Sequence, residues 1–70
     1  MDRVEEMEAA TEGMTLRVYR LQGQLRRLPL IPRSDRQREA RNSFSKRLIQ
    51  AARKDGCLAK VNLMAGRTDD

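Results

Sequence analysis

Two prolines close together divide the sequence into separate helical stretches. Pro29 and Pro32 bracket Leu30 and Ile31. Proline lacks a backbone N–H and its ring clashes with the preceding helical turn, so a helix must end before this pair and cannot restart inside it. The chain has only 70 residues, which is enough for one domain at most. The prolines therefore predict a connection between two helices of one small domain.

The stretch before the prolines is typical of an amphipathic helix over residues 14–28. Val18, Leu21 and Leu25 recur at spacings of three and four, so they share one face of a helix. Gly23 lies in the middle of this helix, where glycine costs about 1 kcal/mol relative to alanine. We expect something to pack closely at Gly23.

The stretch after the prolines predicts a longer helix over residues 35–54. Ser34 followed by Gln37 has the pattern of a capping box at its start, and Gly56 is a good stop signal. Its apolar positions recur at helical spacing and predict a stripe that packs on the first helix. These positions are Ala40, Phe44, Leu48, Ile49 and Ala52.

Three segments remain outside the two helices. Residues 1–13 form an acidic leader that we expect to be a frayed helix, and residues 58–65 have apolar residues at helical spacing and predict a short third helix. Residues 66–70 form a polar tail. No stretch alternates between apolar and polar residues as a half-buried strand does. The prediction is an all-α fold, an antiparallel helical hairpin with a short third helix, whose domain covers residues 14–65.

The charge is unevenly distributed along the chain. The formal net charge is +5, made of −4 in residues 1–13 and +9 in the remainder. A strongly cationic body predicts an acidic partner, which is a nucleic acid, an acidic protein or an anionic membrane surface. Charge alone does not distinguish among these partners.

The residue types argue against catalysis. There is no histidine to act as a base, and the carboxylates outside the leader are few, so a nucleophile with a partner base or a carboxylate pair is not evident. The single cysteine, Cys57, excludes an internal disulfide and is interpreted as a small apolar filler rather than a reactive thiol. We therefore predict a binding protein that is not an enzyme and has no cofactor of its own.

The sequence shows no pattern typical of a transmembrane segment, a secretory signal or a transit peptide. No apolar run approaches the roughly 20 residues that span a bilayer, which predicts no transmembrane segment. The first residues are too acidic for a secretory signal or a typical transit peptide.

Two short motifs resemble the mitochondrial LYR-motif family. Val18-Tyr19-Arg20 is similar to the leucine-tyrosine-arginine signature of that family, with Val18 in place of leucine, and Leu21, Leu25 and Arg26 follow it. Arg41 lies three residues before Phe44, as in the second signature of the family. The resemblance covers roughly residues 14–65.

The resemblance implies a small adaptor of the mitochondrial matrix that binds acyl carrier protein. Such an adaptor serves as a subunit or assembly factor of a respiratory complex, an iron–sulfur machine or a mitochondrial ribosome. The acylated 4'-phosphopantetheine of the carrier would insert between the helices. Motif positions carry over Tyr19, Arg20 and Arg41 as carrier-binding residues, and the face of the second helix adds Arg38, Lys46 and Arg47. The residues expected around the acyl chain are Val18, Leu21, Gly23, Leu25, Phe44 and Leu48.

A second class of function remains open. The arginines would equally neutralise phosphates in a small basic, RNA-bound structural protein of a ribosome. The basic residues are not interleaved with aromatic residues that stack on bases, and the acidic leader would repel RNA. A helix lying on a membrane surface is disfavoured because the chain has no Trp and only one Phe as anchors.

Overall fold

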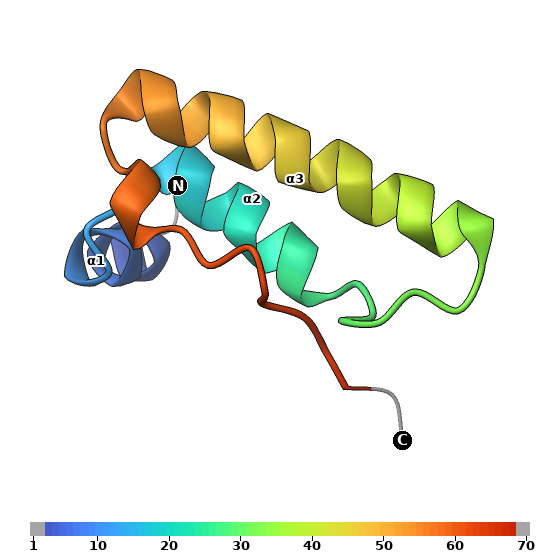
Figure 1. Cartoon of the computed structure of the whole chain (residues 1–70). Coiled ribbons are helices and arrows are strands. Elements are labelled where there is room, and N and C mark those ends of the chain that lie inside the picture. Colours follow the sequence, from blue (N-terminus) through green and yellow to red (C-terminus); the bar gives the residue numbers. More distant parts are fainter. Residues whose placement is uncertain (1–2, 69–70) are drawn as a thin grey trace.

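The computed structural model describes residues 3–68 and contains three α-helices, α1 (Arg3–Thr11), α2 (Leu16–Arg26) and α3 (Asp35–Asp55). A short 3-10 turn, η1 (Leu58–Lys60), follows α3. Helices α2 and α3 lie side by side in opposite directions, α1 packs on α2, and the C-terminal segment crosses in front of the hairpin (Figure 1). The predicted all-α fold with a helical hairpin and a third helix is confirmed, although the third helix is α1 and not the predicted segment over residues 58–65.

The core lies in the seam between α2 and α3. Val18 and Leu25 from α2 meet Leu48 and Ala52 from α3, and all four side chains are fully buried. These residues belong to the apolar stripes seen in the sequence. Partly buried hydrophobic side chains close the rim of this core, namely those of Met14, Leu21, Leu28, Phe44, Ala51 and Val61.

Both ends of α3 are capped by the residues that the sequence indicates. The Ser34 hydroxyl accepts a hydrogen bond from the Gln37 amide at 3.2 Å, and the Gln37 side chain accepts from the Arg33 amide at 2.7 Å. Gly56 ends the helix with φ of 74°, a left-handed conformation that glycine adopts without a steric cost. The predicted helix over residues 35–54 is confirmed to within one residue.

The acidic leader differs from the expected frayed segment. Arg3–Thr11 forms a helix, Gly13 with φ of 73° turns the chain after it, and the α1 residue Ala9 is only 2% exposed. The small Ala9 side chain lets α1 approach its neighbour closely, and carboxylates of α1 meet polar and cationic groups of α2 as described below. The described part of the leader, residues 3–13, therefore belongs to the folded domain.

The predicted helix over residues 58–65 is wrong beyond its first turn. Only η1 is helical, and Val61 has the extended conformation with φ of −81° and ψ of 138°. The cause is Gln22, which is 1% exposed and donates to the Asn62 carbonyl at 2.7 Å while accepting from the Asn62 amide at 3.0 Å. These two bonds hold the Asn62 backbone against α2, so the chain continues as an extended segment.

The extended segment is then tied to the connection between α2 and α3. The Leu30 amide donates to the Arg67 carbonyl at 2.9 Å, and the Arg67 amide donates to the Leu28 carbonyl at 3.1 Å. Residues 66–68 of the predicted polar tail are thus bound to the domain, and the rest of that tail lies outside the described residues.

Candidate binding surfaces

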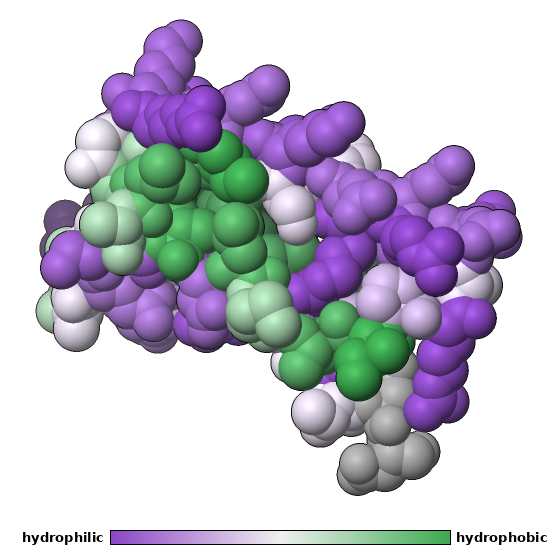
Figure 2. Space-filling view, viewed as in Figure 1, coloured by the Kyte–Doolittle hydropathy of each residue, from purple (hydrophilic) through white to green (hydrophobic). Residues whose placement is uncertain are grey.

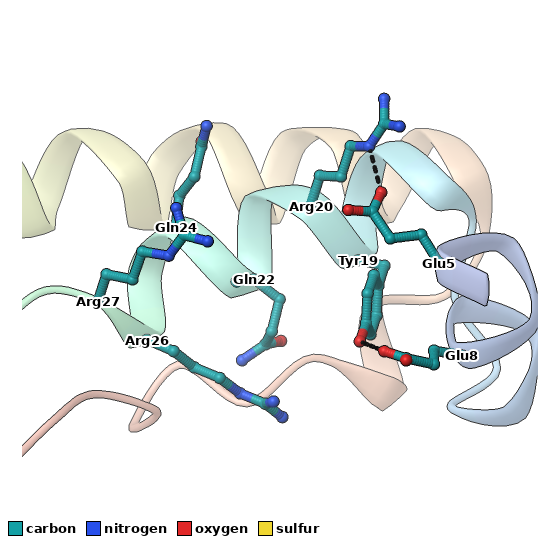
Figure 3. Close-up of a pocket in the computed structure, with 9 residues that line it drawn as sticks. Glu5, Glu8, Tyr19, Arg20, Gln22, Gln24, Arg26 and Arg27 are labelled. Atoms are coloured by element: carbon teal, nitrogen blue, oxygen red, sulfur yellow. Dashed lines mark hydrogen bonds and ion pairs between the residues drawn. The ribbon is translucent and has the colours of Figure 1, made fainter. Parts of the chain in front are cut away.

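The first candidate surface is the face of α2 that lies under α1. Burial of Val18 and Leu25 against α3 turns the neighbouring positions Tyr19, Arg20 and Arg26 away from the core. Tyr19 and Arg20 each meet a carboxylate of α1, as Figure 3 shows, and Arg26 meets that of Glu12, one residue beyond the end of α1. The Arg20 Nε lies 2.8 Å from Glu5 Oε2, the Arg26 Nη2 lies 3.6 Å from Glu12 Oε1, and the Tyr19 hydroxyl donates to Glu8.

Tyr19 is the electrostatically perturbed member of this group. Its phenol donates a hydrogen bond to the Glu8 carboxylate, which favours the protonated form and raises the pKa of Tyr19. Loss of hydration and the negative charges of Glu8 and Glu12 raise this pKa further, whereas Arg26 lowers it. Tyr19 is the only tyrosine in the chain, so its ionisation reports on the docking of α1 without interference.

Two hollows flank this contact between α1 and α2. One has a volume of about 360 Å³ and is lined mostly by residues with charged or amide side chains, together with Tyr19 and Gly23. The other has a volume of about 450 Å³ and a mostly apolar lining that includes Val4 and Met7. Glu8 and Tyr19 line both hollows, so this pair forms the wall between them.

Gly23 does not lie where the sequence led us to expect it. A Cβ atom built on Gly23 has no heavy atom of another part of the molecule within 4 Å. Gly23 lines the polar hollow beside α1 and is not part of the seam between α2 and α3. The expected close packing at Gly23 is therefore wrong, whereas its expected place beside an acyl chain stays a prediction.

The second candidate surface is the outer face of α3. Six cationic side chains are exposed along this helix, and Figure 2 shows hydrophilic residues covering its outer edge. Within residues 3–68 one of the six forms an ion pair, Arg38 with Asp35 at 3.2 Å, and the guanidinium of Arg47 lies 5.8 Å from the centre of the Phe44 ring. The six residues are Arg36, Arg38, Lys46, Arg47, Arg53 and Lys54.

Arg41 has a different role from the other cations of α3. Its guanidinium donates to the carbonyl of Pro29 at 3.1 Å, of Leu63 at 2.9 Å and of Ala65 at 2.8 Å. These three hydrogen bonds clamp the C-terminal segment and the interhelix connection onto α3. The hydrogen-bonding capacity of the Arg41 side chain is therefore used within the fold of the chain.

The predicted site residues divide between the core and the two surfaces. Val18, Leu25 and Leu48 come together as the centre of the core, with Leu21 and Phe44 at its rim. Tyr19 and Arg20 face α1, whereas Lys46 and Arg47 lie on the exposed part of α3. The predicted carrier-binding residues therefore fall on two different surfaces.

Several residues that shape the first surface were missed from the sequence. The carboxylates of the acidic leader were assigned no partner, although the first helix after the leader carries the opposite charge. Gln22 was also missed, although it interrupts an apolar stripe between Val18 and Leu25 at helical spacing. A polar residue inside such a stripe signals a buried hydrogen bond.

A third charged contact joins the start of α2 to the end of α3. The Asp55 carboxylate, whose side chain is 16% exposed, accepts from Arg17 Nη2 at 2.6 Å and from the Thr15 hydroxyl at 2.5 Å. The hydrogen bond from Arg17, followed by that from Thr15, lowers the pKa of Asp55 from 3.8 to about 2. This contact fixes the hairpin rather than a binding site.

The face in front of the hairpin carries a hydrophobic band. Figure 2 shows this band along the C-terminal segment, where the side chain of Met64 is 73% exposed and those of Leu58 and Leu63 are each 39% exposed. Contiguous exposed apolar residues on a small protein mark a surface for interaction.

Among residues 3–68, no group of three or more His, Cys, Asp or Glu side chains is placed to hold a metal ion. None of the helices described combines the length and the hydrophobicity that crossing a membrane requires. No family model, curated protein or solved structure matches the chain.

Proposed function

We propose that this protein is a non-catalytic helical adaptor that binds an acidic partner protein through the outer face of α3. The observation that carries the proposal is the excess of exposed cations on this face, which form one ion pair in the part of the chain that the structure describes. Uncompensated like charges along one helix repel each other, and an acidic partner relieves that repulsion. Such a partner is also attracted from a distance, because complementary charge accelerates association.

The partner we propose is acyl carrier protein, in the mitochondrial matrix. The supporting observations are the resemblance of Val18-Tyr19-Arg20 and of Arg41 with Phe44 to the LYR motifs, and the cationic face. Acyl carrier proteins are acidic, so they match α3 in charge. The adaptor would join the carrier to a respiratory complex, an iron–sulfur machine or a mitochondrial ribosome, and the hydrophobic band of Leu58, Leu63 and Met64 is a suitable surface for that larger assembly.

An acyl chain on the partner would need apolar space. The seam between α2 and α3 is filled by fully buried Val18, Leu25 and Leu48, so a chain entering it would have to separate the helices. The open hollow of about 450 Å³ beside Val4, Met7 and Tyr19 is apolar and requires no such separation. We therefore place the acyl chain of the partner, where one is carried, in this hollow.

The proposal is tested by reversing single charges on α3. Lys46→Glu and Arg36→Glu each remove an exposed cation of α3 that has no ion pair within residues 3–68. An exposed pair is worth about 0.2–1 kcal/mol, and reversal adds repulsion of similar size, so the double variant should bind carrier protein roughly tenfold more weakly at low salt. Affinity is measured by isothermal titration calorimetry at two salt concentrations.

The control is Arg3→Glu, which makes the change of charge of each single α3 variant at an exposed position of α1. Its affinity should stay within about twofold of the wild type, because its charge is remote from α3 and is screened. Equal losses for all variants would contradict docking on α3. Tighter binding of single-stranded RNA than of carrier protein, with the same dependence on Lys46 and Arg36, would instead favour the RNA-bound class.

A further inference from the structure

Helix α1 lies against a cationic face of α2 that contains Tyr19, Arg20 and Arg26, and we call this face the seat. The contacts are made by acidic groups that recur at helical spacing. Glu5 and Glu8 are three residues apart on one side of α1, and Glu12 follows four residues later, just beyond the end of the helix. Their partners on α2 are Arg20, Tyr19 and Arg26. The seat therefore recognises a regular feature, a helix with carboxylates on one face.

Few apolar contacts hold α1 in this seat. Ala9 is the buried residue of α1, while the larger residues Val4 and Met7 are 60% and 69% exposed. The two ion pairs are also open to water, since the side chains of Glu5 and Glu12 are each 38% exposed. Water and salt screen such contacts, so the helix is held more weakly than α2 and α3 hold each other.

The seat extends beyond the helix that occupies it. The hollow of about 360 Å³ continues along α2 from Tyr19 to Gln24 and Arg27 (Figure 3). Within residues 3–68 the Arg27 guanidinium forms no ion pair. A longer acidic helix would reach Arg27 and fill the hollow that α1 leaves open.

We propose that this face of α2, formed by Tyr19, Arg20, Arg26 and Arg27, is a second binding site for an acidic amphipathic helix of a partner protein, and that α1 is its internal occupant. The partner helix replaces α1 and makes the same contacts to Tyr19, Arg20 and Arg26, together with a new one to Arg27. The inference rests on the proposed function in one respect, that the partner is an acidic protein. A partner that contacts both α2 and α3 would bind the outer face of α3 and displace α1 from α2 in the same complex.

The test compares two variants of the full chain that have the same composition and charge. Ala9→Glu puts a charged side chain at the buried contact and should undock α1, whereas Ala10→Glu changes an exposed neighbour and should leave α1 in place. The probe is a lactam-bridged helical peptide with the sequence of residues 3–12. In a protein whose α1 is docked, the probe has to compete with α1 for the same face of α2. Because α1 is attached to the chain, its effective concentration at that face is about millimolar, so the probe binds weakly.

The expected result is that the peptide binds Ala9→Glu at least about tenfold more tightly than it binds Ala10→Glu. Arg20→Gln and Arg26→Gln, introduced into the Ala9→Glu protein, should remove this gain. Diffuse attraction predicts equal binding to both variants, because both have the same net charge, and that outcome would overturn the inference. A gain that survives the loss of both arginines would overturn it as well.

Undocking is verified independently of the peptide. Ultraviolet titration of the single tyrosine should show a lower pKa in Ala9→Glu than in Ala10→Glu, because the hydrogen bond from Tyr19 to Glu8 is lost. Circular dichroism reports whether α2 and α3 remain folded. If Ala9→Glu disrupts them, Glu5→Gln takes its place, with Glu6→Gln as its control of the same net charge, and the same tenfold criterion applies.

The same experiment separates this inference from the proposed function. Carrier protein is titrated in parallel into the wild type and the α3 variants. Peptide binding to the undocked protein without any carrier binding would contradict the proposed partner and leave the seat on α2 established. Carrier binding that depends on α3 but is unchanged between Ala9→Glu and Ala10→Glu, with no binding of the peptide, would contradict the seat alone.

Discussion

Two glycines should respond in opposite directions to the same substitution by alanine. Gly23 lies within α2, where an added Cβ meets no heavy atom of another part of the molecule within 4 Å. Gly23→Ala removes the conformational cost of glycine in a helix and should stabilise the protein by about 0.5–1 kcal/mol. A gain of 1 kcal/mol corresponds to roughly 4–8 °C in Tm for a domain of this size.

Gly66→Ala should instead destabilise the protein. An added Cβ would lie 2.9 Å from the Cα atom of Leu30 and 3.1 Å from the carbonyl oxygen of Leu28. Both are backbone atoms. The backbone hydrogen bonds between Arg67 and the same two residues keep the C-terminal segment close to the interhelix connection, so neither atom can move away easily. Overpacking of this kind costs about 1–3 kcal/mol, so Tm should fall by several degrees or more.

The assay is thermal unfolding of the two variants and the wild type, followed by circular dichroism at 222 nm. A loss of stability in Gly23→Ala would show that another element packs against α2 there, which would refute the position of Gly23 in an open hollow. Unchanged stability in Gly66→Ala would refute the close approach of the C-terminal segment to the interhelix connection.

Three further results are expected. Leu48→Ala, at a fully buried position, should cost about 2–5 kcal/mol and exceed the loss for Phe44→Ala, because Phe44 is only partly buried; chemical denaturation measures both. Arg41→Met should cost about 1–3 kcal/mol and speed amide exchange in residues 61–68, whereas Arg38→Met should change neither. Because the folded state lowers the pKa of Asp55 from 3.8 to about 2, its contribution to stability is present above pH 3.8 and lost as the pH falls toward 2, and Asp55→Asn should reduce this part of the acid dependence in denaturation curves.

The helix α3 was predictable because its signals are local. Ser34 and Gln37 mark its start and Gly56 its end, and the spacing of Leu48 and Ala52 sets the face that is buried. Each of these signals acts within a few residues of its position, so the sequence pattern contains them.

The C-terminal segment was not predictable in the same way. The apolar spacing in residues 58–65 fits a helix, but the backbone of Asn62 is taken by Gln22, which lies 40 residues away in the sequence. Arg41 holds Ala65 across a separation of 24 residues. Hydrogen bonds over such separations override a local preference and leave no periodic signal.

The candidate surfaces were predictable only in part. The cationic outer face of α3 follows from the sequence, because exposed cations lie opposite the apolar stripe. The role of Arg41 as a clamp and the position of Gly23 outside the core do not, since both depend on where the C-terminal segment and α1 lie.

The fold explains why the unpaired positive charge of residues 3–68 is concentrated on α3. Glu5 of α1 neutralises Arg20, Glu12 just beyond α1 neutralises Arg26, and Asp55 neutralises Arg17. These acidic groups of the N-terminal segment and of Asp55 are therefore paired with α2, and only Asp35 and Glu39 of α3 oppose the six exposed cations on its outer face. A partner that supplies acidic groups meets its largest uncompensated field at α3 first. If that partner also presents an acidic helix, the same groups compete with α1 for α2, so α1 sets how much of the cationic surface is available before the partner arrives.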